Sequence, residues 1–322
     1  MAESVMQQLE RFGPDRCGVM SEAEARQWCR RLAGGHYENF SVLSRLVPSH
    51  LRDDFAAVYA FCRWADDLGD EAGDPARSLE LLTWWREELN LCMAGEPRHP
   101  VFVALRPTIT RHDLPVDPFD HLIRAFEQDQ KISRYETWEE LIGYCRLSAD
   151  PVGRLVLMLL GEPREERFFT PSDAICTALQ LTNHWQDLKR DLLCRNRLYI
   201  PHEFIGIKDF EVRFKKAAIQ GYAPDQTFLS EARTLIKGCV ERTWALFEQG
   251  ESLLGLVQPT NRPIIWLFVA GGEHVLRQVE MWNYETVLHR PRLGAARKLQ
   301  LVARAWLMSK LSRSPGSPRR RP

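Results

Sequence analysis

Two aspartates with the spacing of one helical turn, Asp66 and Asp70, lie in the stretch FCRWADDLGDE over residues 61–71. A helix turns once every ~3.6 residues, so both carboxylates would share one face, where like charges destabilise an isolated helix by roughly 0.2–0.5 kcal/mol. A divalent cation would remove this repulsion. Ligands that are all oxygen favour Mg2+, which binds one or two carboxylates together with substrate phosphates. The alternative is a solvated acidic face on which Arg63 pairs with Asp67.

A second pair of aspartates has the same spacing in LTNHWQDLKRDLLCRNRLYIP, residues 181–201. Asp187 and Asp191 lie four residues apart, and Asn183 lies one turn before them on the same helical face. Because both pairs have aromatic and arginine neighbours in helical stretches, we predict that they face each other across a cavity. Mg2+ ions between the two pairs could then hold a diphosphate. The competing interpretation is an exposed helix of alternating charge.

The elements that must position these aspartates are predicted to be helices. Apolar residues recur at intervals of three and four in residues 78–93, 119–132 and 243–257, and strand-like alternation is missing. Clusters of Pro and Gly separate the helical stretches, for example at residues 95–100 and 113–118. The sequence therefore predicts an all-α fold.

The composition indicates one large globular unit without a general affinity for anions. A chain of 322 residues with 44% hydrophobic content can bury a large core. We find no repeat and no internal linker, so we predict one all-helical domain over residues 1–311, followed by a disordered, basic Ser-, Pro- and Arg-rich tail over 312–322. Because 43 basic residues balance 43 acidic ones, nucleic acid is not expected as a partner, and any anion site must be local.

Cysteine usage and hydropathy suggest a cytoplasmic protein. The eight cysteines include no C-x-x-C pair, which argues against a zinc site or a disulfide framework and for a reducing compartment. The first 16 residues lack the apolar core of a secretory signal, and the longest apolar runs fall far short of the ~20 residues that span a bilayer. Residues 298–311 are predicted to form a basic amphipathic helix that could contact the inner face of the cytoplasmic membrane peripherally. Packing on the core with a solvated basic face is the other interpretation.

Four blocks of the sequence, in order, resemble the squalene and phytoene synthase family of head-to-head prenyl transferases. They are HYENFSVLSRLVP (36–48), YAFCRWADDLGDE (59–71), GYCRLSADPVG (143–153) and the stretch over 181–201 described above. The likeness spans residues 30–300. It implies a single-domain helical bundle of the isoprenoid synthase type with a central cavity. It also implies a polyprenyl diphosphate substrate whose diphosphate is held by two or three Mg2+ ions.

The resemblance also assigns roles to residues of this chain. The metal ligands would be Asp66, Asp70, Asp187 and Asp191. The substrate would be bound by His36, Tyr59, Arg63, Arg197, Tyr199, Arg290 and Lys298. The catalytic residues would be Arg63, which holds diphosphate oxygens, Tyr144, whose oxygen could steady a carbocation, and Asn183 beside the metal. Each has an ordinary alternative, such as a surface ion pair for an arginine or a core position for Tyr144.

Two stretches resemble most closely the hydroxysqualene synthase branch of this family. They are RWADDLGDE (63–71) and GGEHVLRQVEMWNYE (271–285), in which Gly271 and Gly272 are predicted to leave room for a water near the cation. That branch converts presqualene diphosphate, which a presqualene diphosphate synthase would hand over, into an alcohol of hopanoid biosynthesis. No dinucleotide fingerprint is present, so NADPH is not expected. Open alternatives are a presqualene diphosphate, squalene, dehydrosqualene or phytoene synthase acting on farnesyl or geranylgeranyl diphosphate, and a non-catalytic assembly factor.

Overall fold

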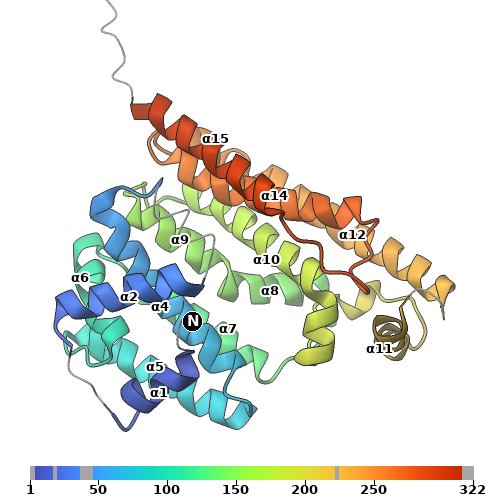
Figure 1. The fold of residues 1–322 in the computed structure, drawn as a ribbon, viewed down its shortest axis with the longest axis horizontal. Helices are drawn as coiled ribbons and strands as arrows, with labels where there is room; N and C mark the ends of the chain where they lie inside the picture. The colour runs from blue at the N-terminus through green and yellow to red at the C-terminus, as the bar shows by residue number, and fades with distance from the viewer. Residues whose placement is uncertain (1–3, 17–19, 37–45, 222–224, 314–322) are drawn as a thin grey trace, which may run out of the picture.

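The computed structural model describes residues 4–16, 20–36, 46–221 and 225–313 (Figure 1). Within these ranges the chain is helical and contains no strand, apart from one isolated bridge between Arg134 and Leu198, so the predicted all-α class is confirmed. The helices are α1 (Val5–Phe12), α2 (Glu22–His36), α4 (Arg52–Asp70), α5 (Pro75–Ala94), α6 (Pro100–His112), α7 (Asp117–Asp129), α8 (Trp138–Ser148), α9 (Asp150–Leu159), α10 (Glu166–Cys194), α11 (Phe210–Gln220), α12 (Gln226–Gly250), α13 (Leu253–Leu256), α14 (Arg262–Met281) and α15 (Ala295–Arg313). Two 3-10 turns cover Ser49–Leu51 and His202–Phe204.

Local capping chemistry sets several of the helix ends. Asp74 caps α5 by accepting a hydrogen bond from the Arg77 N–H, and Gly95 ends the same helix with a φ of 94°. Thr137 and Glu140 form a reciprocal capping box at the start of α8. These short-range signals explain why helix boundaries follow the Pro and Gly clusters of the sequence.

The two aspartate-bearing helices, α4 and α10, are oriented by their apolar faces. Phe61, Trp64 and Leu68 of α4 are fully buried, which fixes the rotation of that helix about its axis. In α10, Trp185 is fully buried and its Nε1–H donates to Thr243 Oγ1 of α12 at 2.8 Å. Because these apolar faces are turned into the core, the polar faces of α4 and α10, which carry the aspartates, are turned toward each other.

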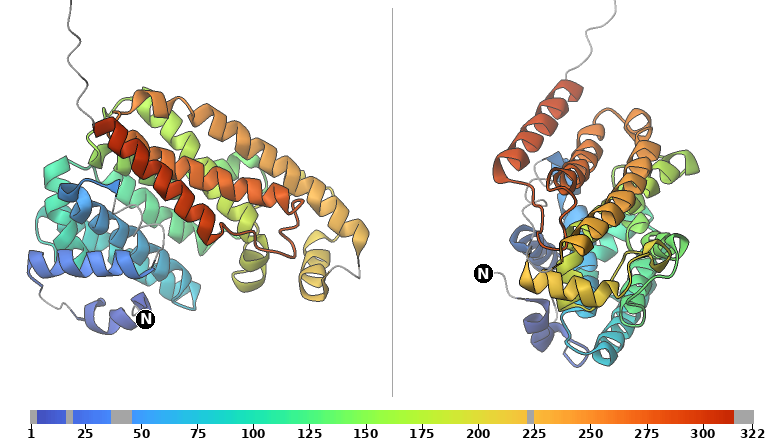
Figure 2. Two further views of the ribbon diagram at one scale, coloured as in Figure 1. Left: turned by 45° about the horizontal axis from the view of Figure 1, so that its top comes forward. Right: turned by 90° about the vertical axis from the view of Figure 1, so that its right-hand side faces the viewer.

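The C-terminal helices lie on one side of the molecule. Helices α12 and α14 pack against α10, and α15 packs against the outer side of α14, as Figures 1 and 2 show from three directions. Helix α15 continues through Ser312 to Arg313 and so includes the first two residues of the predicted tail; the rest of that tail lies outside the described residues. Seven described cysteines are free thiols. In the described ranges, no helix is both long and apolar enough to cross a membrane.

Candidate active site

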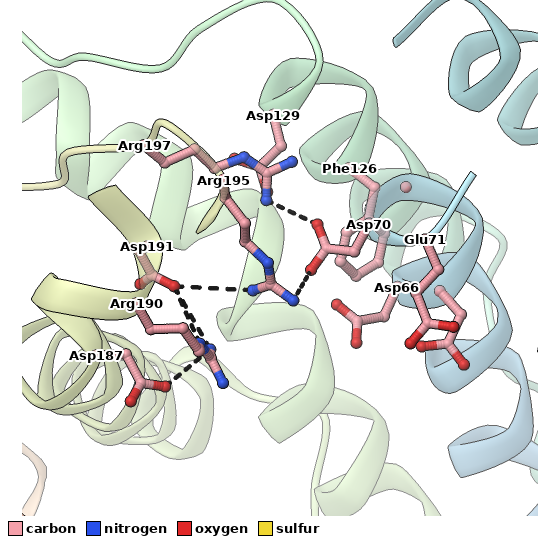
Figure 3. A network of polar contacts seen from close by, with 12 residues as sticks. Asp66, Asp70, Glu71, Phe126, Asp129, Asp187, Arg190, Asp191, Arg195 and Arg197 are labelled. Carbon is pink, nitrogen blue, oxygen red and sulfur yellow. Dashed lines mark hydrogen bonds and ion pairs between the residues drawn. The ribbon is translucent and has the colours of Figure 1, made fainter. Parts of the chain in front are cut away.

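The structure brings the two aspartate pairs together through arginines of the segment that follows α10. Asp70 forms ion pairs with Arg195 (Nη2 to Oδ2, 2.6 Å) and Arg197 (Nη1 to Oδ1, 2.7 Å). The Arg195 guanidinium also lies 3.8 Å from Asp191 Oδ1, so one side chain links α4 to α10 (Figure 3). The first and second pairs are therefore within reach of a single guanidinium group.

Burial and like charge both act on these carboxylates. Partial burial and the neighbouring Asp70 raise the pKa of Asp66. Its side chain keeps 42% of its surface exposed, so this carboxylate can be reached from solvent. Burial likewise raises the pKa of Asp191 to about 6, with a lowering by Arg190 and a further raising by Asp187. A bound cation would stabilise the ionised form of these carboxylates, whose pKa values are raised in its absence.

Arg63 forms the one-turn pair with Asp67 that the sequence left as an alternative. Its Nε donates to Asp67 Oδ2 at 2.9 Å, and its Nη1 lies 3.6 Å from Asp66 Oδ2. However, Asp67 is buried, and burial raises its pKa to about 7 against the opposite pull of Arg63. The alternative of a solvated acidic face is therefore right about the pair of Arg63 with Asp67 but wrong about its solvation, because Asp67 is buried and holds Arg63 from the core side.

The second pair is held by two further arginines. Asp187 forms an ion pair with Arg190 (Nη2 to Oδ2, 2.8 Å) and accepts a hydrogen bond from Arg290 Nη2 at 2.9 Å. Arg290 belongs to the segment after α14, so the structure places it at the aspartates, where the resemblance would have it bind substrate. Asp191 lies 3.5 Å from the Arg190 Nε.

A buried carboxylate that sequence reasoning missed, Asp129 of α7, connects the tyrosines to this network. Tyr144 donates to its Oδ2 at 2.8 Å, Tyr199 donates to its Oδ1 at 3.4 Å, and Arg197 lies 3.7 Å away. Burial raises the pKa of Asp129 to about 7, against the lowering effect of Arg197. Arg197 thus bridges Asp129 and Asp70, and both predicted residues Arg197 and Tyr199 lie in this network.

The signal for Asp129 was present but weak. It occupies a position on the apolar face of its helix, seven residues after Leu122 and four after Ala125, both of which are buried. An aspartate on an apolar face is buried only with polar or charged partners, so this position in the sequence predicts a buried polar contact. For Arg190 and Arg195, the only signal was their closeness in sequence to Asp191.

A cavity of about 190 Å³ lies along the part of α10 that precedes the second pair. Asn183 lines it at the same helical face as Asp187, and Leu179 and Phe268 are among its mostly apolar lining residues from α8, α9, α10, α13 and α14. Tyr144 points its hydroxyl at Asp129, so the structure gives it a partner in the polar network. An apolar cavity that adjoins a charged cluster suits a ligand with a hydrocarbon chain and an anionic head.

The predicted water space at Gly272 is wrong. A Cβ at this position would clash with the Leu179 side chain and would lie 3.0 Å from Phe247 Cζ. The missing side chain therefore lets α14 approach α10 and α12 closely. A Cβ on Gly271, in contrast, would meet no described atom within 4 Å.

All seven predicted substrate roles stay predictions, and three of these residues lie apart from the contacts described above. The His36 side chain lies outside the described residues, although the residue ends α2. Tyr59 is half-buried one turn before Arg63 in α4, and Lys298 is half-buried in the first turn of α15. The described contacts do not assign either of them a role in the site.

The side chains of the site fit a Mg2+ ion that takes some of its ligands from the protein and the others from the substrate. The four aspartates offer only oxygen ligands, and the guanidinium groups of Arg190 and Arg195 already occupy positions for positive charge between them (Figure 3). Within the described part of the chain, no group of three or more His, Cys, Asp or Glu side chains is arranged to hold a metal by itself. Phosphate oxygens and waters would have to complete the coordination, as is usual for Mg2+.

Comparison with known proteins decides the family. The family model described as squalene/phytoene synthase matches residues 33–297, a range that contains both aspartate pairs. The chain belongs to the squalene/phytoene synthase family. This membership accounts for the all-helical fold with two aspartate-bearing helices that face each other.

Relatives within the squalene/phytoene synthase family carry several names. The chain is similar to the hydroxysqualene synthase of Zymomonas mobilis (40% identity over 181 residues, 53% of this chain and 57% of the relative). It thus matches little more than half the length of that relative. Similarity extends to the hydroxysqualene synthase of Sinorhizobium fredii (36% identity, 62% of this chain and 68% of the relative) and to the phytoene synthase of Arthrospira platensis (26% identity, 90% and 95%).

Solved structures of the family share the architecture. The squalene synthase HpnC from Alicyclobacillus acidocaldarius superposes with a TM-score of 0.72 at 43% identity, covering 82% of this chain and 96% of that one. A dehydrosqualene synthase superposes with a TM-score of 0.74 at 23% identity, covering 90% of this chain and 98% of that one. The fold is therefore that of the isoprenoid synthases.

Proposed function

We propose that this chain is a Mg2+-dependent hydroxysqualene synthase, which converts presqualene diphosphate and water into hydroxysqualene and diphosphate. The observation that carries the proposal is the pair of facing aspartate clusters beside an apolar cavity, in a chain 40% and 36% identical to hydroxysqualene synthases over the matched regions. The charged cluster suits a diphosphate, and the cavity suits a long hydrocarbon.

The proposed reaction balances without a reductant. The bond between the substrate carbon and the diphosphate oxygen breaks, and its electron pair leaves with the diphosphate. The carbocation rearranges, a water oxygen bonds to it, and that water loses one proton. Because no hydride is consumed, NADPH is not part of the proposal.

The arginines provide charge at the leaving group. Mg2+, when bound, would act as a Lewis acid and neutralise the developing charge of the diphosphate. Arg63, Arg195 and Arg290 each lie against an aspartate of the cluster, so their guanidinium groups can turn to phosphate oxygens once metal takes the carboxylates. Arginine suits this task because its planar fork binds phosphate with two hydrogen bonds.

Two features would protect the cation. The cavity lining is mostly apolar, which limits the water that reaches the reacting carbons, and Asn183 sits where the cavity meets the aspartate face. Tyr144 and Tyr199 hold Asp129, which in turn holds Arg197 against Asp70, so we assign the tyrosines a positioning role. This assignment replaces direct stabilisation of the cation by the Tyr144 oxygen.

A second candidate function is condensation of two prenyl diphosphates. It is favoured by the match to the phytoene synthase of Arthrospira platensis, which spans 95% of that relative, although at 26% identity. The same aspartates would serve either reaction. A non-catalytic assembly factor is the least supported alternative, since all four aspartates are present and three of them, Asp70, Asp187 and Asp191, are joined by ion pairs through Arg195 and Arg190.

The discriminating experiment is product analysis by mass spectrometry. The purified protein is incubated with Mg2+ and either presqualene or farnesyl diphosphate, with and without NADPH, and with EDTA as the metal-free control. Hydroxysqualene from presqualene diphosphate without NADPH would support the proposal. Consumption of farnesyl diphosphate would move the chain to a condensing branch, and turnover of neither substrate would favour the assembly factor.

The cellular setting follows from the same proposal. The substrate would be received from a presqualene diphosphate synthase, and the product would enter squalene and hopanoid biosynthesis. We place the protein in the cytoplasm, in keeping with the free state of the seven described cysteines.

A further inference from the structure

Helix α15 exposes large apolar side chains on the side that faces away from the protein. Leu299, Trp306, Leu307 and Leu311 have exposed fractions of 70%, 49%, 55% and 77%. Their spacing, at intervals of seven, eight and twelve residues from Leu299, puts them on one helical face together with Ala303. We call these four residues the outer face of α15.

This face is distinct from the one that packs. Leu301, Ala305 and Ser309 are buried and recur at intervals of four residues, which is the side turned to α14. Figures 1 and 2 show α15 on the outside of the molecule along α14. Helix α15 therefore has two apolar sides. Within the described chain, only one of them packs against another helix.

The charge around the outer face has one sign. Helix α15 contains five basic residues and no acidic one. Arg297, Arg304 and Lys310 of α15 are exposed beside the outer face, and Lys310 Nζ lies 5.4 Å from the Trp306 ring centroid. The whole chain has no net charge, so the positive charge of this helix is a local feature.

We propose that the outer face of α15 docks on an anionic lipid bilayer, with the helix lying in the headgroup region. Leucines and a tryptophan would enter the boundary of the acyl chains, and the flanking arginines and lysine would bind lipid phosphates. A second copy of the chain fits this face less well, because pairing two such helices would bring like charges together. The proposal goes beyond the proposed reaction and does not depend on it.

The docked face would lie one helix away from the cavity. In α14, Ile265 and Phe268 line the cavity, whereas the Trp266 ring on another side of the same helix is covered by Arg304 of α15 at 4.9 Å. Helix α14 therefore lies between the docked face and the cavity. Docking on a bilayer would hold the cavity close to the lipid phase, which suits a protein whose proposed ligand carries a hydrocarbon chain.

The test is vesicle co-sedimentation of the full chain, without substrate. Vesicles of equal parts phosphatidylglycerol and phosphatidylcholine are compared with pure phosphatidylcholine at low and high salt. We expect binding to the anionic vesicles only, and weaker binding at high salt. The double variant Trp306→Ser/Leu307→Ser should bind at least roughly a hundredfold more weakly, because it removes two side chains and each buried side chain of this size contributes about one power of ten or more.

A matched control comes from α11, where Val212 and Ile219 are similarly exposed. The variant Val212→Ser/Ile219→Ser should bind vesicles as the wild type does, and thermal unfolding should show that both double variants are folded. The proposal is overturned if the wild type does not bind anionic vesicles, or if both double variants lose binding equally. It is also overturned if light scattering shows a wild-type dimer that Trp306→Ser/Leu307→Ser converts to a monomer while vesicle binding is absent.

Discussion

Replacement of Asp129 by asparagine is expected to change how the stability of the metal-free protein depends on pH. Asp129 is buried, and burial raises its pKa from 3.8 to about 7. Asparagine keeps an oxygen that can accept the hydrogen bond from Tyr144 but removes the ionisation. The variant therefore isolates the cost of an ionised carboxylate at this position.

The sign and size follow from proton linkage. Between pH 4 and pH 7 the folded protein holds a proton on Asp129 that the unfolded chain has lost, so this group loses its stabilising contribution as the pH rises through the folded pKa of about 7. Each pKa unit corresponds to about 1.36 kcal/mol, so the wild type should lose about 3 kcal/mol of unfolding free energy relative to Asp129→Asn between pH 5 and pH 8.

The assay is guanidinium denaturation of both proteins in EDTA at several pH values. Other buried groups titrate as well, but they are common to both proteins and cancel in the difference. Asp117→Asn, an exposed change in the first turn of the same helix, serves as the control and should keep the wild-type pH dependence. A difference between wild type and Asp129→Asn that stays constant from pH 5 to pH 8 would refute this reasoning.

Two further changes test the aspartate face and the packing of α14. Asp66→Asn and Asp187→Asn should each lower Mg2+-dependent diphosphate release by at least roughly a hundredfold, as loss of one electrostatic contributor to a transition state does, with the circular dichroism spectrum unchanged; retained turnover would show that these carboxylates do not bind metal. Gly272→Ala should destabilise the fold by about 1–3 kcal/mol through overpacking against Leu179 and Phe247, seen as a lower midpoint of thermal unfolding. Gly271→Ala, whose Cβ meets open space, should not lower that midpoint, and equal destabilisation by both changes would contradict the packing argument.

The sequence by itself determined the helices and the chemistry of the aspartates. Spacings of four residues place Asp66 with Asp70, and Asp187 with Asp191, on one helical face whatever the rest of the chain does. The period of apolar residues is equally local, which explains why the all-α class was predictable. This period does not fix where a helix ends: the stretch over residues 243–257, predicted as one helix, is divided between α12 and α13.

Only the tertiary structure decided what each polar side chain meets. Asp67 is buried rather than solvated, Asp129 joins the site from a third helix, and the space beside Gly272 is filled by Leu179 of another helix. Likewise, the sequence predicted one apolar side of α15, but the structure shows a second one facing outward. Helical phase is set by neighbours in sequence, whereas burial and ion pairing depend on which helices pack together, and no spacing within one helix contains that information.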